Sequence, residues 1–412
     1  MRDLPLTILA IFAHPDDEIG VGSSLAHYSD LGVFTVLACA SRGEAATIYC
    51  EDCATRETLA DVRTHELECA VRNIGIGQLR WLGWPDGGIP SLPRERAIGR
   101  IVTLIREIQP DVLLTHPENG LYPHPDHLAV WEIVRAAYDA AADISQYPQA
   151  GKPWATSRLY TRALPQRYFD QAPEFAAARV ELNGQLLPFI PTPDEDVDVT
   201  MHVEAWAPRR LAAWECHRSQ HNPEGAFVFM PADLRQMQAE NEYFVLVAAR
   251  NALPSGVEND LLAGLGGAED ERQEPTGEQD PAQSLRATLS ARRGYLAVYD
   301  EYRRQNPKPD FLALLQKLAD AEQEMIYLLA GALRRAGEPP TTVEPDGRAL
   351  TQALTCLDLW SRWQFLRVSA THAAAVFAGR AGAASDEAER ELWTELQKLA
   401  GEQLDAVQAL TV

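Results

Sequence analysis

The stretch Thr7-Ile-Leu-Ala-Ile-Phe-Ala13 runs directly into His14-Pro-Asp-Asp-Glu18. The first part is a continuous apolar run followed by turn residues, which is typical of a strand buried in a parallel sheet. The second part places an imidazole and two adjacent carboxylates at the carboxyl end of that strand. A helix cap formed by Asp16 or Asp17 is the alternative interpretation of this motif.

The first half of the chain alternates such apolar runs with amphipathic segments. Further strands are expected at residues 33–40, 78–82 and 111–115, and helices at residues 18–28, 56–74, 94–109 and 126–142. Repeated strand–helix–strand units predict an α/β fold with a mostly parallel, Rossmann-like sheet and helices on both faces. Ligands bind such sheets at the carboxyl ends of the strands, near a topological switch point. Residues 158–250 are interpreted as the completion of the same domain.

The composition changes between Val257 and Ser284, where eight acidic residues accompany a single basic one. A stretch of this kind is typical of a solvated linker rather than of a packed core. We therefore expect three parts: an α/β domain at residues 1–255, an acidic linker at 256–284 and a helical domain at 285–412.

The helical domain contains four long segments with short connections. These segments lie at residues 285–305, 310–336, 350–378 and 386–410 and predict a C-terminal α-helical bundle of four helices. They lack the Glu-x-x-His pairs of di-metal carboxylate bundles, so we expect an interaction or homo-oligomerisation module. The aromatic residues Trp360, Trp363 and Phe365 are expected to form part of its core.

The overall charge limits the classes of partner. The chain has 412 residues and a formal net charge of −22, from 37 basic and 59 acidic side chains. A nucleic-acid partner needs a basic stripe and a membrane-surface protein needs clustered Lys and Arg, so we expect neither. We find no signal-peptide pattern and no apolar window of about 18 residues that could span a membrane.

The cysteines bear on the compartment. Six irregularly spaced cysteines without a secretion signal are expected to be free thiols in a reducing cytoplasm. The one C-x-x-C motif, Cys50-Glu-Asp-Cys53, has no second ligand pair nearby. It is interpreted as part of a surface loop, with metal binding or a disulfide as the alternatives.

A second polar motif, His124-Pro-Asp-His127, follows the fourth expected strand and opens a helix. Both motifs follow strands that run the same way, so both reach the same edge of the sheet. His14, Asp17 and His127 would then supply two imidazoles and one carboxylate with an open fourth position, which is the pattern of catalytic zinc. A divalent metal other than zinc is an alternative for the ion. A histidine-rich turn that only caps the helix is the alternative interpretation of the second motif.

The remaining polar groups of the two motifs have roles that follow from their places. Asp16 lies next to an expected ligand and could take a proton from water. His124 lies one helical turn from His127 and could donate to an oxyanion or a leaving group. Asp126 could orient a histidine ring as a hydrogen-bond partner.

The two motifs together resemble the LmbE-like, or PIG-L, family of metal-dependent deacetylases. Members of that family remove acetyl groups from N-acetylglucosamine units of glycosylphosphatidylinositol, mycothiol and bacillithiol precursors, and they include a mycothiol-conjugate amidase. The resemblance covers roughly residues 5–250. Supporting matches are Ser41-Arg-Gly-Glu44, Arg63-Thr-His-Glu-Leu67, Asp111-Val-Leu-Leu-Thr-His116 and His217-Arg-Ser-Gln220.

The resemblance implies the same zinc ligands and the same roles for Asp16 and His124 as the residues themselves suggest. It further implies that Arg63 and Asp86 contact sugar hydroxyls, although Arg63 could instead be a surface residue paired with Glu66. The loop at residues 47–55 departs from the family pattern, which leaves the substrate open.

Three functions are therefore carried forward. The first is a zinc-dependent hydrolase that removes an acetyl group from a small N-acetylated amino sugar. The second is an amidase acting on a thiol–sugar conjugate. The third is a non-catalytic, metal-stabilised scaffold whose bundle recruits partners.

Overall fold

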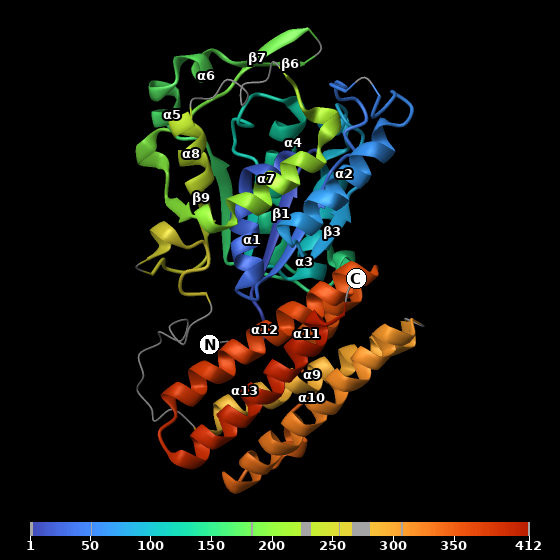
Figure 1. The fold of residues 1–412 in the computed structure, drawn as a ribbon, viewed down its shortest axis with the longest axis vertical. Coiled ribbons are helices and arrows are strands. Elements are labelled where there is room, and N and C mark those ends of the chain that lie inside the picture. The colour runs from blue at the N-terminus through green and yellow to red at the C-terminus, as the bar shows by residue number, and fades with distance from the viewer. Residues whose placement is uncertain are drawn as a thin grey trace. The chain divides into compact units, whose positions relative to one another are not determined.

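The computed structural model describes residues 3–50, 52–182, 184–223, 232–254, 256–265, 281–305 and 308–410. The chain divides into two compact units (Figure 1). The α/β unit comprises residues 7–29 and 35–264, and the helical unit comprises residues 1–6, 30–34 and 265–412.

The described part of the α/β unit is built on a sheet of seven strands in the order β3-β2-β1-β4-β5-β9-β8. These strands are β1 (Thr7–Phe12), β2 (Phe34–Cys39), β3 (Gln78–Trp81), β4 (Val112–Thr115), β5 (Arg158–Ala163), β8 (Val199–His202) and β9 (Asn241–Ala249). The pairs β1–β4, β2–β3 and β4–β5 are parallel, whereas β9 runs antiparallel to both β5 and β8. A hairpin of β6 (Arg179–Leu182) and β7 (Gln185–Pro188) is separate.

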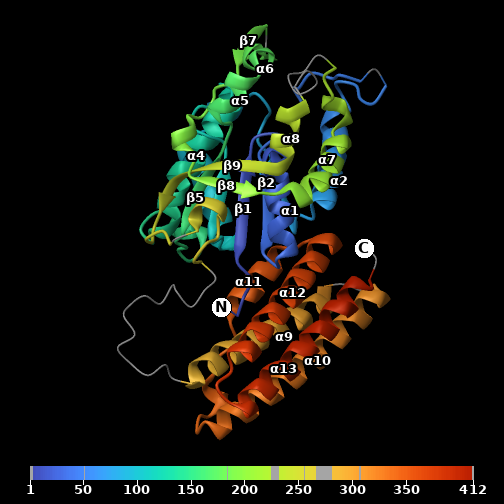
Figure 2. The same cartoon turned by 60° about the vertical axis from the view of Figure 1, so that its left-hand side comes forward.

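Helices cover both faces of this sheet. The described helices of this unit are α1 (Gly22–Asp30), α2 (Leu59–Ile74), α3 (Arg94–Ile108), α4 (Pro125–Ala142), α5 (Gln166–Gln171), α6 (Pro173–Ala177), α7 (Ala207–Cys216) and α8 (Ala232–Glu240). Figures 1 and 2 show α1, α2 and α7 on one face and α3 and α4 on the other. All residues of β1, β2 and β4 are buried, as expected for strands covered on both sides.

The strand order creates a switch point between β1 and β4. The chain passes from β1 outward through β2 and β3, and then returns to place β4 on the other side of β1. The segments that leave β1 and β4 therefore diverge, and a crevice opens at the carboxyl ends of these two strands. Both polar motifs follow these two strands, which places them at the crevice.

The mostly parallel, Rossmann-like sheet predicted from the sequence is confirmed, followed by a helical region. The expected strands at 33–40, 78–82 and 111–115 agree with β2, β3 and β4 to within one residue at each end. Strand β5 was not expected, although it pairs with β4 along its length. Residues 256–264 also belong to the α/β unit, where Leu261 and Leu262 are buried, so this part of the expected linker is packed. The expected linker residues 266–280 lie outside the described residues.

The described helical unit holds five helices rather than the four expected. They are α9 (Pro281–Gln305), α10 (Pro309–Arg335), α11 (Gly347–Thr355), α12 (Leu359–Ala383) and α13 (Glu387–Gln408). The single helix expected at residues 350–378 is wrong. The chain breaks before Asp358, whose carboxylate accepts the N–H of Ser361 and begins a new helix.

The core of the bundle lies between the long helices, which run alongside one another in Figure 2. It contains Leu289, Met325, Leu329, Phe377, Trp393 and Leu396, among others. Phe365 is buried as expected, but Trp360 and Trp363 are only half-buried. No described helix, in either unit, combines the length and apolar character needed to cross a membrane.

Candidate active site

Three side chains converge at the crevice between β1 and β4. His14 and Asp17 lie on the turn after β1, and His127 lies in the first turn of α4. Nδ1 of His14 is 3.3 Å from Nε2 of His127 and 3.6 Å from Oδ2 of Asp17, and Nε2 of His127 is 3.5 Å from Oδ1 of Asp17. Ligands bound tetrahedrally at about 2.0–2.1 Å from zinc are about 3.4 Å apart, so this triangle fits such an ion.

Hydrogen bonds on the far sides of the rings orient both histidines. Nδ1 of His127 lies 2.9 Å from the carbonyl oxygen of Gly120, so this nitrogen carries the proton and Nε2 is left as a ligand. Nε2 of His14 lies 3.2 Å from Asp126 and 3.1 Å from Asp86, which leaves Nδ1 facing the triangle. The prediction that Asp126 orients a histidine ring is consistent with this geometry.

Asp126 is itself held in place. Its side chain is fully buried, and its carboxylate accepts the backbone N–H groups of Gly87 at 2.7 Å and Ile89 at 3.2 Å. These N–H groups belong to the loop after β3. The ring of His14 is therefore fixed by three segments at this sheet edge, which are the turn after β1, the loop after β3 and the start of α4. A buried carboxylate with this many donors has one stable orientation.

The charge at the triangle suits a cation. Burial raises the pKa of Asp17, but the charges of His127, His116 and His14 outweigh it and hold this pKa well below the ordinary value. Burial lowers the pKa of His14, but hydrogen bonds to Asp126 and Asp86 and the charge of Asp17 raise it to about 10. Burial and the charge of His116 lower the pKa of His127 well below its ordinary value.

Asp16 sits beside the triangle in a strained backbone conformation. Its φ of 98° lies in the left-handed region, which residues other than glycine rarely adopt. Nη2 of Arg63 lies 3.0 Å from Oδ2 of Asp16, and the same guanidinium donates to the carbonyl oxygens of Pro15 and Gly43. Burial raises the pKa of Asp16 to about 6, against the charge of Arg63.

His124 caps α4 in a defined tautomer. Its Nδ1 accepts the backbone N–H of Asp126 at 3.2 Å, so the ring proton is on Nε2. Burial and the charge of His14 lower the pKa of His124 to about 4, and the ring is therefore neutral. A neutral imidazole with Nε2–H is a hydrogen-bond donor, 4.8 Å from the ring of His14 between centroids.

The residues expected to contact a sugar are both engaged by the protein. Arg63 is 2% exposed and binds the turn that contains Asp16, and it is not the surface partner of Glu66. Glu66 instead accepts the N–H and hydroxyl of Ser219. Asp86 accepts the N–H of Ala45 as well as facing His14. Sugar contacts by Arg63 and Asp86 stay predictions.

Three other groupings in the described residues could hold a metal. One replaces Asp17 by His124, beside His14 and His127, one joins Asp17 and His127 to His116, and one joins His14 to Asp86 and Asp126. His116 is buried, and its Nε2 accepts the N–H of Ala13 at 3.0 Å while its ring stacks on His127. That bond occupies the ligand atom, which favours a structural role for His116.

Three residues at the site were not found from the sequence. Tyr122 is two positions before His124 and packs its ring against His127, at 5.0 Å between centroids. Arg162, at the end of β5, donates to the carbonyl of Asp17 at 3.4 Å. Glu18 is buried and lies 2.7 Å from Nε2 of His217. Tyr122 could have been placed at the site from the sequence, because it lies only two positions before His124. Arg162 could not, because its position depends on the unexpected strand β5.

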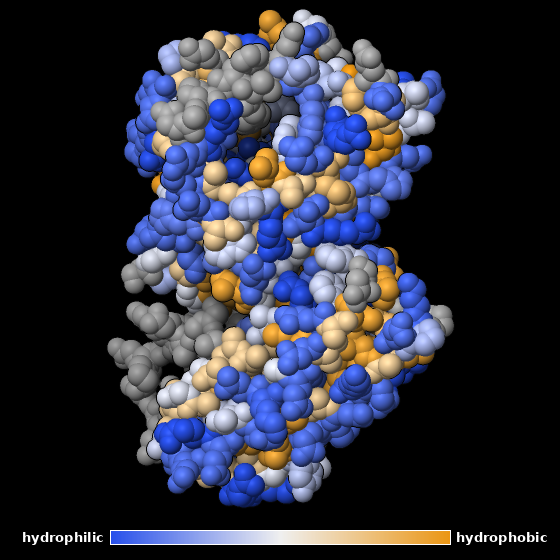
Figure 3. Space-filling model, viewed as in Figure 1, coloured by the Kyte–Doolittle hydropathy of each residue, from blue (hydrophilic) through white to orange (hydrophobic). Residues whose placement is uncertain are grey.

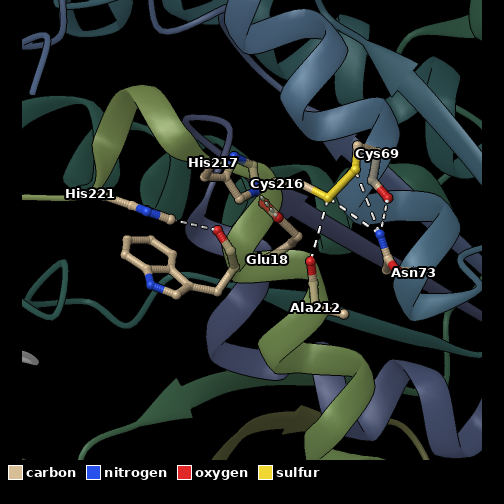
Figure 4. The surroundings of a disulfide bond; sticks show 8 residues. Glu18, Cys69, Asn73, Ala212, Cys216, His217 and His221 are labelled. Atoms are coloured by element: carbon tan, nitrogen blue, oxygen red, sulfur yellow. Dashed lines mark hydrogen bonds and ion pairs between the residues drawn. A yellow bond between two sulfur atoms is a disulfide. The ribbon is translucent and has the colours of Figure 1, made fainter. Parts of the chain in front are cut away.

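Four of the six cysteines are not free thiols, which corrects the expectation from the sequence. The structure pairs Cys50 with Cys53 and Cys69 with Cys216 as disulfides, while Cys39 and Cys356 are free and buried. The second disulfide joins α2 to α7 across a sequence separation of 147 residues (Figure 4). Spacing along the sequence gives no sign of such a pair.

The face of the α/β unit seen in Figure 3 is mostly hydrophilic and is hollowed in its upper part. At the switch point the described residues bring together a His/Asp cluster that could hold a metal, the half-buried carboxylate of Asp16 and the imidazole of His124. Fold and site thus define a Rossmann-like protein with a candidate metal site at the carboxyl edge of its sheet.

Comparisons with known proteins identify the family. Residues 9–138 match the family model PIG-L, described as GlcNAc-PI de-N-acetylase. A 1D-myo-inositol 2-acetamido-2-deoxy-alpha-D-glucopyranoside deacetylase from Geodermatophilus obscurus is 31% identical over 289 residues, which cover 63% of this chain and 98% of the relative. An enzyme of the same name from Thermomonospora curvata is 30% identical, over 65% of this chain and 100% of the relative. The chain belongs to the PIG-L family.

A solved structure is also similar to part of the chain. The N,N'-diacetylchitobiose deacetylase from Pyrococcus horikoshii has a TM-score of 0.44 and 19% sequence identity, and the match covers 58% of this chain and 83% of that one.

Proposed function

We propose that the protein is a metal-dependent N-deacetylase that hydrolyses the acetamido group of a small N-acetylated amino sugar. The triangle of His14, Asp17 and His127, with Asp16 held at its edge, carries this proposal. The names of the relatives support the substrate class, since both act on a 2-acetamido-2-deoxy-glucopyranoside.

The metal is proposed to be zinc. Two imidazoles and one carboxylate are the ligand set of catalytic zinc sites, and the carboxylates around His14 favour a divalent cation. A zinc ion bound there supplies Lewis-acid chemistry, which polarises a carbonyl group and makes a water molecule more acidic.

Asp16 is the proposed general base. It is adjacent to a metal ligand, and its raised pKa places the carboxylate near the range in which a base works well close to neutrality. Arg63 positions it, because one guanidinium fixes both the carboxylate of Asp16 and the backbone of the turn.

His124 is the proposed donor to the developing oxyanion. Its Nε2–H is available because Nδ1 is used by the helix N-terminus, and the ring is neutral and fixed before substrate arrives. A preorganised donor of this kind stabilises the charge that appears on the carbonyl oxygen in the tetrahedral transition state. The same group can pass its proton to the leaving amine.

The test is turnover of N-acetylglucosamine derivatives by metal-loaded Asp16→Asn protein, with metal content measured in parallel. We expect zinc to remain bound and turnover to fall by about 10²–10⁴-fold. Full activity in the metal-loaded variant would remove Asp16 as the base.

No observation on the described residues favours the amidase or the scaffold. Homo-oligomerisation through the bundle and a cytoplasmic location remain predictions.

A further inference from the structure

The Cys69–Cys216 disulfide ties two helices together next to the active site. Cys216 is the last residue of α7, and His217 follows it directly. The Cα atoms of the two cysteines are 5.8 Å apart, which is a usual separation for a disulfide. Figure 4 shows the bond between α2 and α7, with Glu18 and His217 close by.

The disulfide lines an open cavity. This cavity has a volume of about 600 Å³ and is bordered by Asp61 and His65 of α2, by Arg218, and by three cysteines, Cys53, Cys69 and Cys216. That volume is in the range of small-molecule sites. Cys69 and Cys216 are both half-buried, so the bond between them can be approached from this side. Charged side chains of both signs border the cavity, and such groups can bind a small polar molecule.

Asn73 supplies a donor for a departing thiolate. Its side-chain nitrogen is held by the carbonyl oxygen of Cys69 at 3.0 Å and lies 3.3 Å from Sγ of Cys216 and 3.6 Å from Sγ of Cys69. A hydrogen bond to sulfur stabilises the thiolate more than the disulfide, and a better-stabilised leaving group departs faster.

We propose that the Cys69–Cys216 disulfide is a reactive bond that a small thiol reaches through this cavity, and that its reduction lowers the activity of the enzyme. The effect on activity rests on the proposed deacetylase function, whereas the reaction of the disulfide does not.

The reaction is two thiol–disulfide exchanges. The thiolate of a small thiol attacks one Sγ, the Sγ–Sγ bond breaks, and its electron pair leaves on the other cysteine as a thiolate. A second thiolate attacks the sulfur of the small thiol in the resulting mixed disulfide and displaces the remaining cysteine. Two small thiols are oxidised to their disulfide, and Cys69 and Cys216 are reduced and take up the two protons.

A short chain of contacts connects this bond to the base. Nε2 of His217 lies 2.7 Å from Oε1 of Glu18, and Oε2 of Glu18 accepts the backbone N–H of Asp16 at 2.8 Å. The disulfide fixes the end of α7 from which His217 reaches Glu18. After its loss, α2 is still bound by Arg209 near the start of α7, through the carbonyl oxygens of Asn73 and Ile74, and by Ser219 through Glu66. His217 and Glu18 are therefore positioning residues in this proposal.

The experiment uses the full chain, oxidised with glutathione disulfide, loaded with zinc and then treated with excess reduced glutathione. Alkylation and peptide mass spectrometry follow the Cys69–Cys216 bond, and kcat is measured on an N-acetylated amino sugar. We expect kcat to fall about tenfold as this bond is reduced and to recover on reoxidation. Amide hydrogen exchange in residues 207–221 is expected to become faster on reduction.

Matched variants separate this bond from other effects of glutathione. Cys69→Ser/Cys216→Ser is expected to have the low kcat in both conditions, and Cys50→Ser/Cys53→Ser is expected to respond as the unchanged protein does. Asn73→Ala should slow reduction of the bond while leaving kcat of the oxidised protein as it was. If the double Cys69/Cys216 variant does not fold, reversible reduction of the unchanged protein supplies the comparison.

Two results would overturn the proposal. One is equal kcat and equal hydrogen exchange before and after complete reduction of the bond. The other is alkylation of both cysteines in the glutathione-disulfide-treated protein, which means that no bond forms. If neither redox state deacetylates any substrate, the proposed function fails, and hydrogen exchange and the rate of reduction still decide whether the bond is reactive and holds α7.

Discussion

Nε2 of His14 lies 3.2 Å from Oδ2 of Asp126, and this carboxylate is bound in turn by two backbone N–H groups of the loop after β3. Asp126 is buried and is not one of the three proposed ligands, but it holds the ligand His14 in place. We expect Asp126→Asn to weaken zinc binding by about 10–100-fold, because the ring of His14 loses its orienting charge. Competition with a chromogenic chelator measures this affinity, and an unchanged affinity would contradict the role of Asp126.

The ligand triangle can be distinguished from the alternative that contains His124. We expect Asp17→Asn to lose zinc on dialysis, whereas His124→Gln should keep it and lose about 10²–10³-fold in kcat, since one oxyanion donor is removed. Metal content by elemental analysis is compared between the two variants. Retention of zinc by Asp17→Asn together with loss by His124→Gln would favour the other triangle.

Arg63 offers a test between positioning and substrate contact. Its two Nη atoms bind Asp16 and two carbonyl groups, so we expect Arg63→Gln to lower kcat by about 10²-fold with little change in KM. Steady-state kinetics on an amino-sugar substrate give both values. A large rise in KM at unchanged kcat would instead support the predicted contact with a sugar hydroxyl.

Glu322 makes the stability of the bundle depend on pH. This fully buried carboxylate accepts hydrogen bonds from Tyr299 and Gln403 and lies 3.4 Å from Nε of Arg292. Burial raises the pKa of Glu322 above 4.5 despite the charge of Arg292, so the folded state binds this proton more tightly than the unfolded chain does. The stability that the protonated Glu322 contributes is fully present below pH 4.5, and it is lost as the pH rises through the pKa of Glu322 in the folded state.

We therefore expect Glu322→Gln, which cannot titrate, to gain stability relative to the unchanged protein as the pH rises from 4.5 toward neutrality. Urea unfolding of both proteins at several pH values, followed by the helical signal, gives the difference. The other titrating groups are common to both proteins, so their contributions cancel in the difference between the two free energies of unfolding. A difference that does not vary with pH would show that Glu322 keeps its ordinary pKa.

The catalytic edge of the sheet was predictable because its signals are local. Strands β1 and β4 are buried apolar runs, and each leads within a few residues into a motif rich in His and Asp. Topology then brings the two motifs together, since parallel neighbouring strands end at one edge. The roles of His14, Asp17 and His127 could be proposed from spacing and ligand chemistry alone.

Features fixed by distant partners could not be predicted in this way. Strand β5 begins with Arg158, a charged residue that is buried only because it binds the carbonyl of Leu261, about a hundred residues later. Cys69 and Cys216 meet through the packing of α2 against α7. The break before Asp358 was different, because an aspartate three residues before Ser361 is a local capping signal that the sequence did carry.

The two motifs of the metal triangle lie 113 residues apart in the chain, measured from His14 to His127. In the unfolded protein these ligands are far from one another, so only the folded sheet binds the ion tightly. With the metal binding proposed above, the melting temperature should rise with the logarithm of the free zinc concentration. A cell short of zinc would hold a larger unfolded fraction of this chain, so metal supply would govern its abundance as well as its chemistry.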